Sequence, residues 1–151
     1  MAGGKIIVSQ DYIERLGLND AELAMLLAHE MSHATLRHNL QEYELALRLE
    51  PHWAQAPFVA LEDAVDNDSA LIAKLAPLGY THEREADREG MLLAWHAGWP
   101  AVRLANYFKK MMRASGRPNF ESPTHPAPSE RWLAAQALAA TLPVHAPESA
   151  H

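Results

Sequence analysis

Apolar side chains recur every three or four positions along most of this chain, which is the spacing of helices that pack one face against a core. Leu23, Leu27 and Met31 follow this spacing in the clearest segment. The pattern predicts helices over about 10–16, 20–48, 59–75, 81–97, 100–115 and 129–141. The only convincing strand is the short β-branched run Lys5–Val8. We therefore predict an α+β fold that is mostly α, in a single domain covering residues 1–151.

Local signals indicate where some of these helices begin. Asn19, followed by Glu22 three residues later, is typical of a capping box at a helix start. Thr81 is expected to cap the later acidic helix. The proline-rich stretch 116–128 is predicted to be a loop, and residues 143–151 a frayed tail.

Composition narrows the class of protein. With 48% hydrophobic and 21% charged residues in a chain of 151, an ordinary globular core is expected. A net charge of −6 without a basic block argues against a nucleic-acid partner. The absence of cysteine excludes a disulfide framework and a thiolate zinc site. No apolar run approaches the about 18 residues of a membrane-spanning helix, and the first residues lack a signal-peptide pattern.

The segment from His29 to His33 is a His-Glu-x-x-His motif inside a predicted helix. Residues four apart on a helix share a face, so both imidazoles can bind one metal ion. Glu30 follows the first histidine, where its carboxylate can hold the water needed for hydrolysis. Shuffled chains of this composition contain the motif in roughly 4% of cases. The alternative, a pair of packing or surface histidines, therefore stays open at this point.

A catalytic zinc takes three protein ligands, so a third has to be found. A histidine six residues after His33 would complete one known motif, but Asn39 stands there. The acidic helix offers Glu83 and Asp87, which are four apart and share a face. One of them can bind the metal while the other accepts the free N–H of a ligand histidine. The alternative is an exposed helix with Glu–Arg ion pairs, and two acids of its other face are expected to be solvated: Glu85 and Glu89.

Further motifs follow in a fixed order from residue 3 to about residue 135. They are Gly3-Gly4-Lys5-Ile6, Glu22-Leu23-Ala24, Ala28-His29-Glu30-Met31-Ser32-His33 with His38 after it, Glu83-Arg84-Glu85-Ala86-Asp87-Arg88-Glu89-Gly90, Ala97-Gly98-Trp99, Phe108-Lys109-Lys110-Met111, and Thr124-His125-Pro126 with Arg131 after it. In their order and spacing they resemble the gluzincin zinc metallopeptidases of the HtpX, BepA and CAAX prenyl protease type.

This resemblance implies a zincin-like domain with a short N-terminal strand, an active-site helix and a second helix that bears a ligand Glu. It implies one Zn²⁺ per chain with three ligands: His29, His33 and Glu83. Glu30 is implied to be the general base, and Asp87 to support a ligand histidine from outside the metal shell. His125 is implied more weakly, as an extra ligand.

The chain also departs from the family pattern. The usual Ser-Arg before the acidic helix is Thr81-His82 here. Family members carry more chain before the Gly-Gly strand, usually with its sheet partner, so a fragment or a reduced version is expected. With such an upstream segment, the resemblance implies a periplasmic or membrane-associated protein. The strand Gly3–Ser9 is then free to pair with an extended substrate, with a second copy of the chain, or within an ordinary sheet.

Several residues leave alternatives open. His38 lies five residues after His33, about 140° round a continuous helix, and is interpreted as a packing or surface residue and not as a ligand. His82 adjoins Glu83 and either lines the site or lies at the surface of a helix start, and the surface role is the one expected. Arg131 either pairs with a carboxylate near the site or is an exposed helix charge. Three residues are candidate donors to the anion that develops on the substrate: Arg131, His82 and His125.

The leading hypothesis is a zinc-dependent endopeptidase that cleaves protein or peptide substrates, with Glu30 as general base. The alternative is a metal-stabilised binding or chaperone module whose latent site is capped by His125. Glu30 favours the enzyme, because a purely structural metal site has no use for it.

Overall fold

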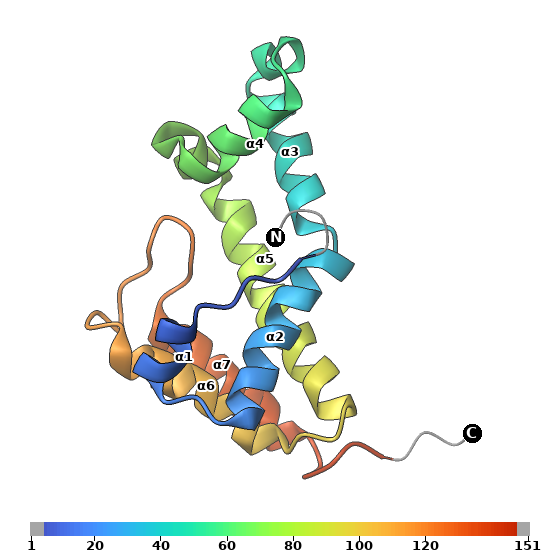
Figure 1. Cartoon of the computed structure of the whole chain (residues 1–151), viewed down its shortest axis with the longest axis vertical. Helices are drawn as coiled ribbons and strands as arrows, with labels where there is room; N and C mark the ends of the chain where they lie inside the picture. Colours follow the sequence, from blue (N-terminus) through green and yellow to red (C-terminus); the bar gives the residue numbers. More distant parts are fainter. Residues whose placement is uncertain (1–4, 148–151) are drawn as a thin grey trace.

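The computed structural model describes residues 5–147, which are predominantly helical (Figure 1). In chain order the elements are α1 (Gln10–Leu16), α2 (Asp20–Thr35), α3 (His38–Leu49), the 3-10 helix η1 (Pro51–Gln55), α4 (Phe58–Asn67), α5 (Ser69–His96), α6 (Ala101–Ala114) and α7 (Pro128–Thr141). α2 packs along α5 through the middle of the molecule, with α6 and α7 at one end and α3 and α4 at the other (Figure 1). The mostly helical fold predicted from the sequence is confirmed.

The predicted capping box fixes the start of α2. The Asn19 side chain accepts the Glu22 N–H at 3.1 Å, and the Glu22 carboxylate accepts the Asn19 N–H at 2.9 Å. Glu22 is buried, and Lys110 of α6 donates to its carboxylate at 2.6 Å. The first turn of α2 is thereby joined to α6, which fixes the direction in which α2 runs past the core.

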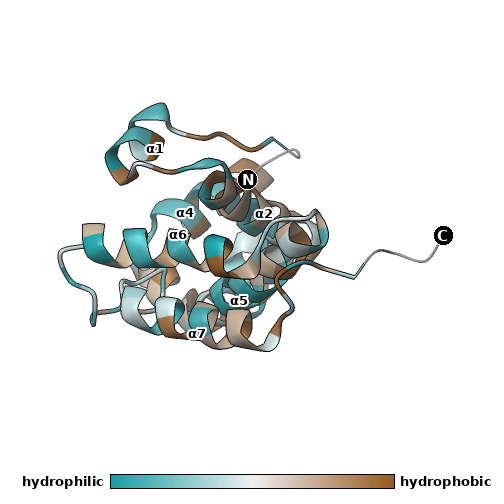
Figure 2. Cartoon of the chain, turned by 90° about the horizontal axis from the view of Figure 1, so that it is seen from below, coloured by the Kyte–Doolittle hydropathy of each residue, from teal (hydrophilic) through white to brown (hydrophobic). Residues whose placement is uncertain are grey.

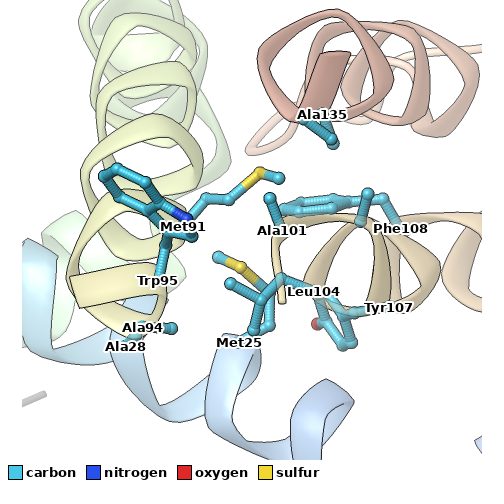
Figure 3. Packing of buried hydrophobic residues seen from close by; sticks show 12 residues of the cluster. Met25, Ala28, Met91, Ala94, Trp95, Ala101, Leu104, Tyr107, Phe108 and Ala135 are labelled. Carbon is cyan, nitrogen blue, oxygen red and sulfur yellow. The ribbon is translucent and has the colours of Figure 1, made fainter. Parts of the chain in front are cut away.

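The main hydrophobic core lies where α2, α5, α6 and α7 meet. Figure 3 shows Met25 of α2 and Met91 of α5 beside Leu104 and Phe108 of α6, with Ala135 of α7 above them. Seen from below, α5, α6 and α7 each carry hydrophobic and hydrophilic stretches, as helices with one buried face do (Figure 2). Burial of the apolar faces thus holds α2 and α5 together along the half that carries the acidic and histidine motifs.

A second, smaller core joins α3 and α4 to the first half of α5. Its buried members are Ala46, Leu61, Ala64, Leu71 and Leu75. This cluster supports the upper half of α5, which would otherwise project beyond the main core (Figure 1).

The helix predicted over 20–48 is in fact two helices. Arg37 adopts a left-handed conformation with φ of 58°, which ends α2 and turns the chain into α3. An arginine in this conformation carries no sequence signal, because glycine and asparagine are the usual residues there. The apolar periodicity continues across the break, so the pattern could not reveal it.

The helices predicted over 59–75 and 81–97 have different boundaries. α4 ends at Asn67, and Asp68 starts α5 by accepting the N–H groups of Ala70 and Leu71 at 2.9 and 3.1 Å. α5 then continues without interruption to His96. The helices predicted over 10–16, 100–115 and 129–141 are confirmed to within one residue at each end.

Thr81 is therefore not a helix cap, and that prediction was wrong. It lies inside α5, where its hydroxyl donates to the Pro77 carbonyl at 3.1 Å. Pro77 removes one backbone hydrogen bond from the helix. The apolar residues on both sides of Pro77 are buried in the two cores, and this packing keeps α5 continuous.

The predicted strand is also not found: residues 5–9 form no strand in the structure, and Gly3 and Gly4 lie outside the described residues. The physical reason is that the described part of the chain offers this segment no second strand with which to form hydrogen bonds. Among the described helices, none combines the length and the apolar character needed to cross a lipid bilayer.

Candidate metal centre

α2 presents two histidines on one face, one turn apart. His29 is 5% exposed and His33 is half-buried beside it. Their Nε2 atoms lie 3.1 Å apart. Ser32 turns its hydroxyl back to the Ala28 carbonyl at 2.8 Å, so it does not compete for this face. The helical repeat alone produces the pairing, because residues at i and i+4 stand above one another.

α5 supplies a carboxylate opposite these rings. Oε1 of Glu83 lies 3.3 Å from Nε2 of His33, and Oε2 lies 3.7 Å from Nε2 of His29. One donor atom from each residue lies within 4.8 Å of the other two. In a tetrahedral zinc site with bonds of about 2.0–2.1 Å, the ligand atoms are about 3.3 Å apart. The observed separations are near that value, so these three residues fit a zinc ion.

The electrostatics of Glu83 also suit a cation. Glu83 is 8% exposed, and burial by itself would raise the pKa of its carboxyl group. The contact with His33 and the charge of Arg131 outweigh burial and bring the pKa to about 2. Oε2 is nevertheless buried without an aligned hydrogen bond from any described residue. A buried, ionised oxygen that lacks a hydrogen-bond donor is a suitable metal ligand.

Asp87 and Arg131 connect this site to α7. Oδ1 of Asp87 lies 3.0 Å from Nδ1 of His29, although the ring is not aligned for a regular hydrogen bond. Arg131 donates to both oxygens of Asp87, from Nε at 2.7 Å and from Nη2 at 2.6 Å. Its Nη2 also lies 3.3 Å from Oε2 of Glu83. Of the two alternatives for Arg131, the structure shows the buried carboxylate pair and not the exposed charge.

Arg131 keeps its charge despite being 6% exposed. Burial acts to lower its pKa, but the hydrogen bonds and charge of Asp87 outweigh burial and raise it. The buried guanidinium therefore balances part of the negative charge that the two carboxylates bring to the site.

Glu30 lies where two hollows of the surface meet. The larger, of about 980 Å³, runs along residues 7–9, α1 and the loop before α7, and the smaller, of about 380 Å³, opens towards α3 and α4. His29, Glu30 and His125 border both hollows. Glu30 is half-buried, and it borders both hollows beside the face of α2 that carries His29 and His33.

His125 approaches the site from the proline-rich loop. Its Nε2 lies 3.6 Å from Oε2 of Glu83, and its side chain is 52% exposed. Ser122 and Thr124 hold it in place, by a 3.0 Å hydrogen bond from the His125 N–H to the Ser122 hydroxyl and a 2.7 Å contact between Nδ1 and the Thr124 hydroxyl. The residue is thus near enough to serve either as an extra ligand or as a cap, and its role stays a prediction.

Two histidines are buried: His38, which was expected in packing or at the surface, and His82, which was expected at the surface. His38 is inaccessible to solvent and His82 is 1% exposed. The break at Arg37 turns His38 back towards the site, so its packing role is confirmed and a surface role is wrong. Burial, together with the neighbouring His82 and His33, lowers the pKa of His38 to about 4. The surface role expected for His82 is likewise wrong, because α5 continues through it.

Sequence reasoning missed the contact that His38 makes with the site. Its Nδ1 lies 2.9 Å from Nδ1 of His33, and its Nε2 lies 3.2 Å from Oε2 of Glu85. The prediction that Glu85 is solvated is correct for its 52% exposed side chain, but the carboxylate also contacts a buried imidazole. The helical spacing between His33 and His38 did not indicate this contact. The one sequence signal for it was the position of His38 in the family motif.

Comparison with known proteins identifies the family. The pattern of peptidase family M48 matches residues 1–139. The chain belongs to peptidase family M48. M48 members are metal-dependent peptidases, so the chain carries a metallopeptidase domain, and the resemblance seen in the sequence is confirmed.

This M48 chain is similar to the "Beta-barrel assembly-enhancing protease" of Escherichia coli (strain K12), with 29% identity over 143 residues, 85% of this chain and 29% of that protein. The protein of the same name from Yersinia pestis is 27% identical over 157 residues, which cover 95% of this chain and 32% of its own length. The chain therefore spans about a third of the length of the curated relatives it matches. No solved structure gives a significant match.

Proposed function

We propose that this chain is a zinc-dependent endopeptidase domain whose metal is held by His29, His33 and Glu83, one ion per chain. The observation that carries the proposal is the geometry of the three donor groups. Their separations of 3.1, 3.3 and 3.7 Å are close to the distance between two ligand atoms in a tetrahedral zinc site. The groups come from two helices that are packed together through the main core.

When bound, zinc supplies Lewis-acid chemistry: it polarises the substrate carbonyl and lowers the pKa of water towards neutrality. Glu30 then takes a proton from the attacking water and delivers it to the leaving amine. Its half-buried position at the meeting point of both hollows supports this role, because both the water and the scissile bond can reach it.

Asp87 and Arg131 hold the site in this geometry. Asp87 faces Nδ1 of His29 and favours the ring orientation in which Nε2 is directed at Glu83. Arg131 fixes both oxygens of Asp87 and so limits its rotation. Because Arg131 already pairs with two carboxylates, His125 is better placed than Arg131 to donate to the developing substrate anion.

The larger hollow fits an extended polypeptide. Residues 7–9 form its rim, and the Ile7 side chain is 94% exposed. We propose that this segment pairs with the substrate backbone, as an edge that lacks a partner strand can. Pairing between two copies through Gly3–Ser9 is the competing proposal, and sedimentation over a concentration series distinguishes them because only self-pairing depends on protein concentration.

The setting in the cell is proposed from likeness alone. The relatives are named for β-barrel assembly, and by that likeness we propose unfolded or misassembled polypeptide as the substrate class. The periplasmic or membrane-associated location follows from the same resemblance.

A binding or chaperone module with a latent site is the alternative. It is favoured by His125, whose Nε2 lies 3.6 Å from a carboxylate oxygen of the metal site. In that case His125 would occupy the position that water needs, and turnover would be negligible. Replacing His125 by Ala would then increase peptide cleavage, whereas a donor to the substrate anion would lose activity.

The test is to replace Glu30 by Gln and to measure zinc content and casein cleavage in the same preparation, with a chelator-treated sample as the control. The variant should keep its zinc and lose hydrolysis by about 10²- to 10⁴-fold, the scale for loss of a general base. Cleavage equal to the parent would exclude Glu30 as the base. Absence of zinc from the parent would contradict the metal assignment itself.

A further inference from the structure

A line of buried polar side chains leads from the metal-binding face to the far side of α5. Nδ1 of His33, the ring nitrogen turned away from Glu83, lies 2.9 Å from Nδ1 of His38. Nε2 of His38 lies 3.2 Å from Oε2 of Glu85, whose side chain is 52% exposed. The line therefore begins at a candidate zinc ligand and ends at a carboxylate in contact with solvent.

The chemistry of the last member fixes the direction of every proton in this line. An ionised carboxylate only accepts hydrogen bonds, so Nε2 of His38 carries the proton and donates to Glu85. A neutral imidazole has one N–H, so Nδ1 of His38 is an unprotonated acceptor. At 2.9 Å, the proton between the two rings then belongs to Nδ1 of His33.

This assignment leaves Nε2 of His33 with a free lone pair, directed at Glu83 Oε1 at 3.3 Å and at Nε2 of His29 at 3.1 Å. We infer, on the basis of the zinc site proposed above, that His38 and Glu85 are positioning residues that hold His33 in the tautomer able to bind zinc. His29 faces its carboxylate, Asp87, directly, whereas His33 is connected to one through an intervening imidazole.

His82 fixes the plane of the intervening ring. It stacks on His38 with ring centroids 4.0 Å apart and an angle of 4° between the planes. Its own nitrogens face Glu42 Oε1 at 3.1 Å and Gln41 Oε1 at 3.2 Å. Both rings are fully buried, so His38 cannot rotate away from His33 without disturbing α3.

The decisive comparison is between His38→Asn and His38→Leu. The Asn oxygen can take the place of Nδ1 as an acceptor, whereas Leu is closer to His in size but offers none. Zinc affinity is measured by competition with a chromophoric chelator, and thermal unfolding of the metal-free proteins reports packing. We expect the Leu variant to bind zinc about 10- to 100-fold more weakly than the parent, and the Asn variant to remain within a few-fold of it.

A role in packing alone predicts the opposite order, because Asn leaves the larger void. The inference is overturned if the Leu variant binds zinc like the parent, or if Asn binds as weakly as Leu. Thermal unfolding of the metal-free forms separates the effects, since loss of affinity in a variant with unchanged stability cannot come from packing.

Glu89 in α5 provides a matched control for Glu85, the last residue of the line. Glu85 and Glu89 are one turn apart and have comparable side-chain exposures of 52% and 40%, but only Glu85 contacts His38. Glu85→Ala should weaken zinc binding several-fold, and Glu89→Ala should leave it unchanged. Equal effects of the two substitutions would contradict a specific role for Glu85.

Histidine nitrogen NMR tests the tautomers without any reliance on activity. The expected result is a proton on Nδ1 of His33 and on Nε2 of His38, in the metal-free protein and in the zinc-loaded protein. The reverse assignment would overturn the inference even if zinc binds. A parent protein that shows the expected tautomers but binds no zinc would contradict the proposed function and leave the hydrogen-bonded line intact.

Discussion

Gly90 permits the close approach of α2 and α5 that brings the proposed zinc ligands together. It is buried in α5, and a Cβ atom placed on it would lie 2.8 Å from both the Cα and the N of His29 and 3.0 Å from the carbonyl carbon of Ala28. Ordinary contacts begin near 3.4 Å, so the atoms of a Gly90→Ala protein have to move apart by about 0.6 Å to restore an ordinary contact at this point. The atoms in contact are backbone atoms, which cannot rotate aside.

Two opposing effects determine the expected change in the stability of Gly90→Ala. Alanine gains about 0.5–1 kcal/mol over glycine in a helix, whereas overpacking a tight contact costs about 1–3 kcal/mol. Overpacking should dominate at Gly90, with a net loss of about 1–2 kcal/mol and a fall in Tm of about 2–8 °C. Ligand groups must be held to within about 0.5 Å, so we also expect zinc affinity to fall by about 10- to 100-fold.

Gly79 of the same helix provides the matched control. A Cβ atom there would meet nothing within 4 Å, so Gly79→Ala should be neutral or raise Tm slightly, with zinc affinity unchanged. Both variants are measured by thermal unfolding with and without zinc and by chelator competition. If Gly90→Ala matches Gly79→Ala in both measurements, the close contact does not position the ligands, and the reasoning is refuted.

Three further predictions concern the ligands and their support. His33→Ala should remove most bound zinc and the zinc-dependent part of thermal stability, and full occupancy by metal analysis would contradict its role as a ligand. Asp87→Asn should raise the zinc dissociation constant by about 10- to 100-fold, and an unchanged value would exclude its support of His29. The folded-state pKa of Glu83, about 2, lies below its ordinary value of 4.5. The ionised Glu83 therefore stabilises the metal-free fold at pH values above 4.5, and this stabilisation is lost as the pH falls towards 2. In urea unfolding, the parent should therefore lose more stability on acidification than Glu83→Gln, and equal losses would count against the shift.

The parts of the site that sequence could predict are those that depend on local spacing. His29 with His33, and Glu83 with Asp87, each lie four apart on a helix, so their shared faces follow from the helical repeat. The family resemblance then supplied the pairing of the two helices. Placement of Arg131 beside Asp87 depends on how α7 packs, and the sequence left it as one of two alternatives.

The features that sequence could not predict arise from packing between distant segments. The left-handed Arg37 redirects α3 and buries His38, although no glycine or proline marks the break. Pro77 would normally indicate the end of a helix, but burial on both sides of it keeps α5 whole and encloses His82. For the segment 5–9, the β-branched residues indicated strand propensity, but a strand also needs a partner.

The ion pair between Arg131 and Asp87 has a consequence for the protein while it is being made. A ribosome adds about 5–20 residues per second, so Arg131 is synthesised about 5–20 s after His29. During that interval the growing chain already carries the His-Glu-x-x-His segment, but α7 has not yet been added to fix Asp87. A site whose proposed support, the Asp87–Arg131 ion pair, needs so late a residue cannot be completed until α7 has been synthesised.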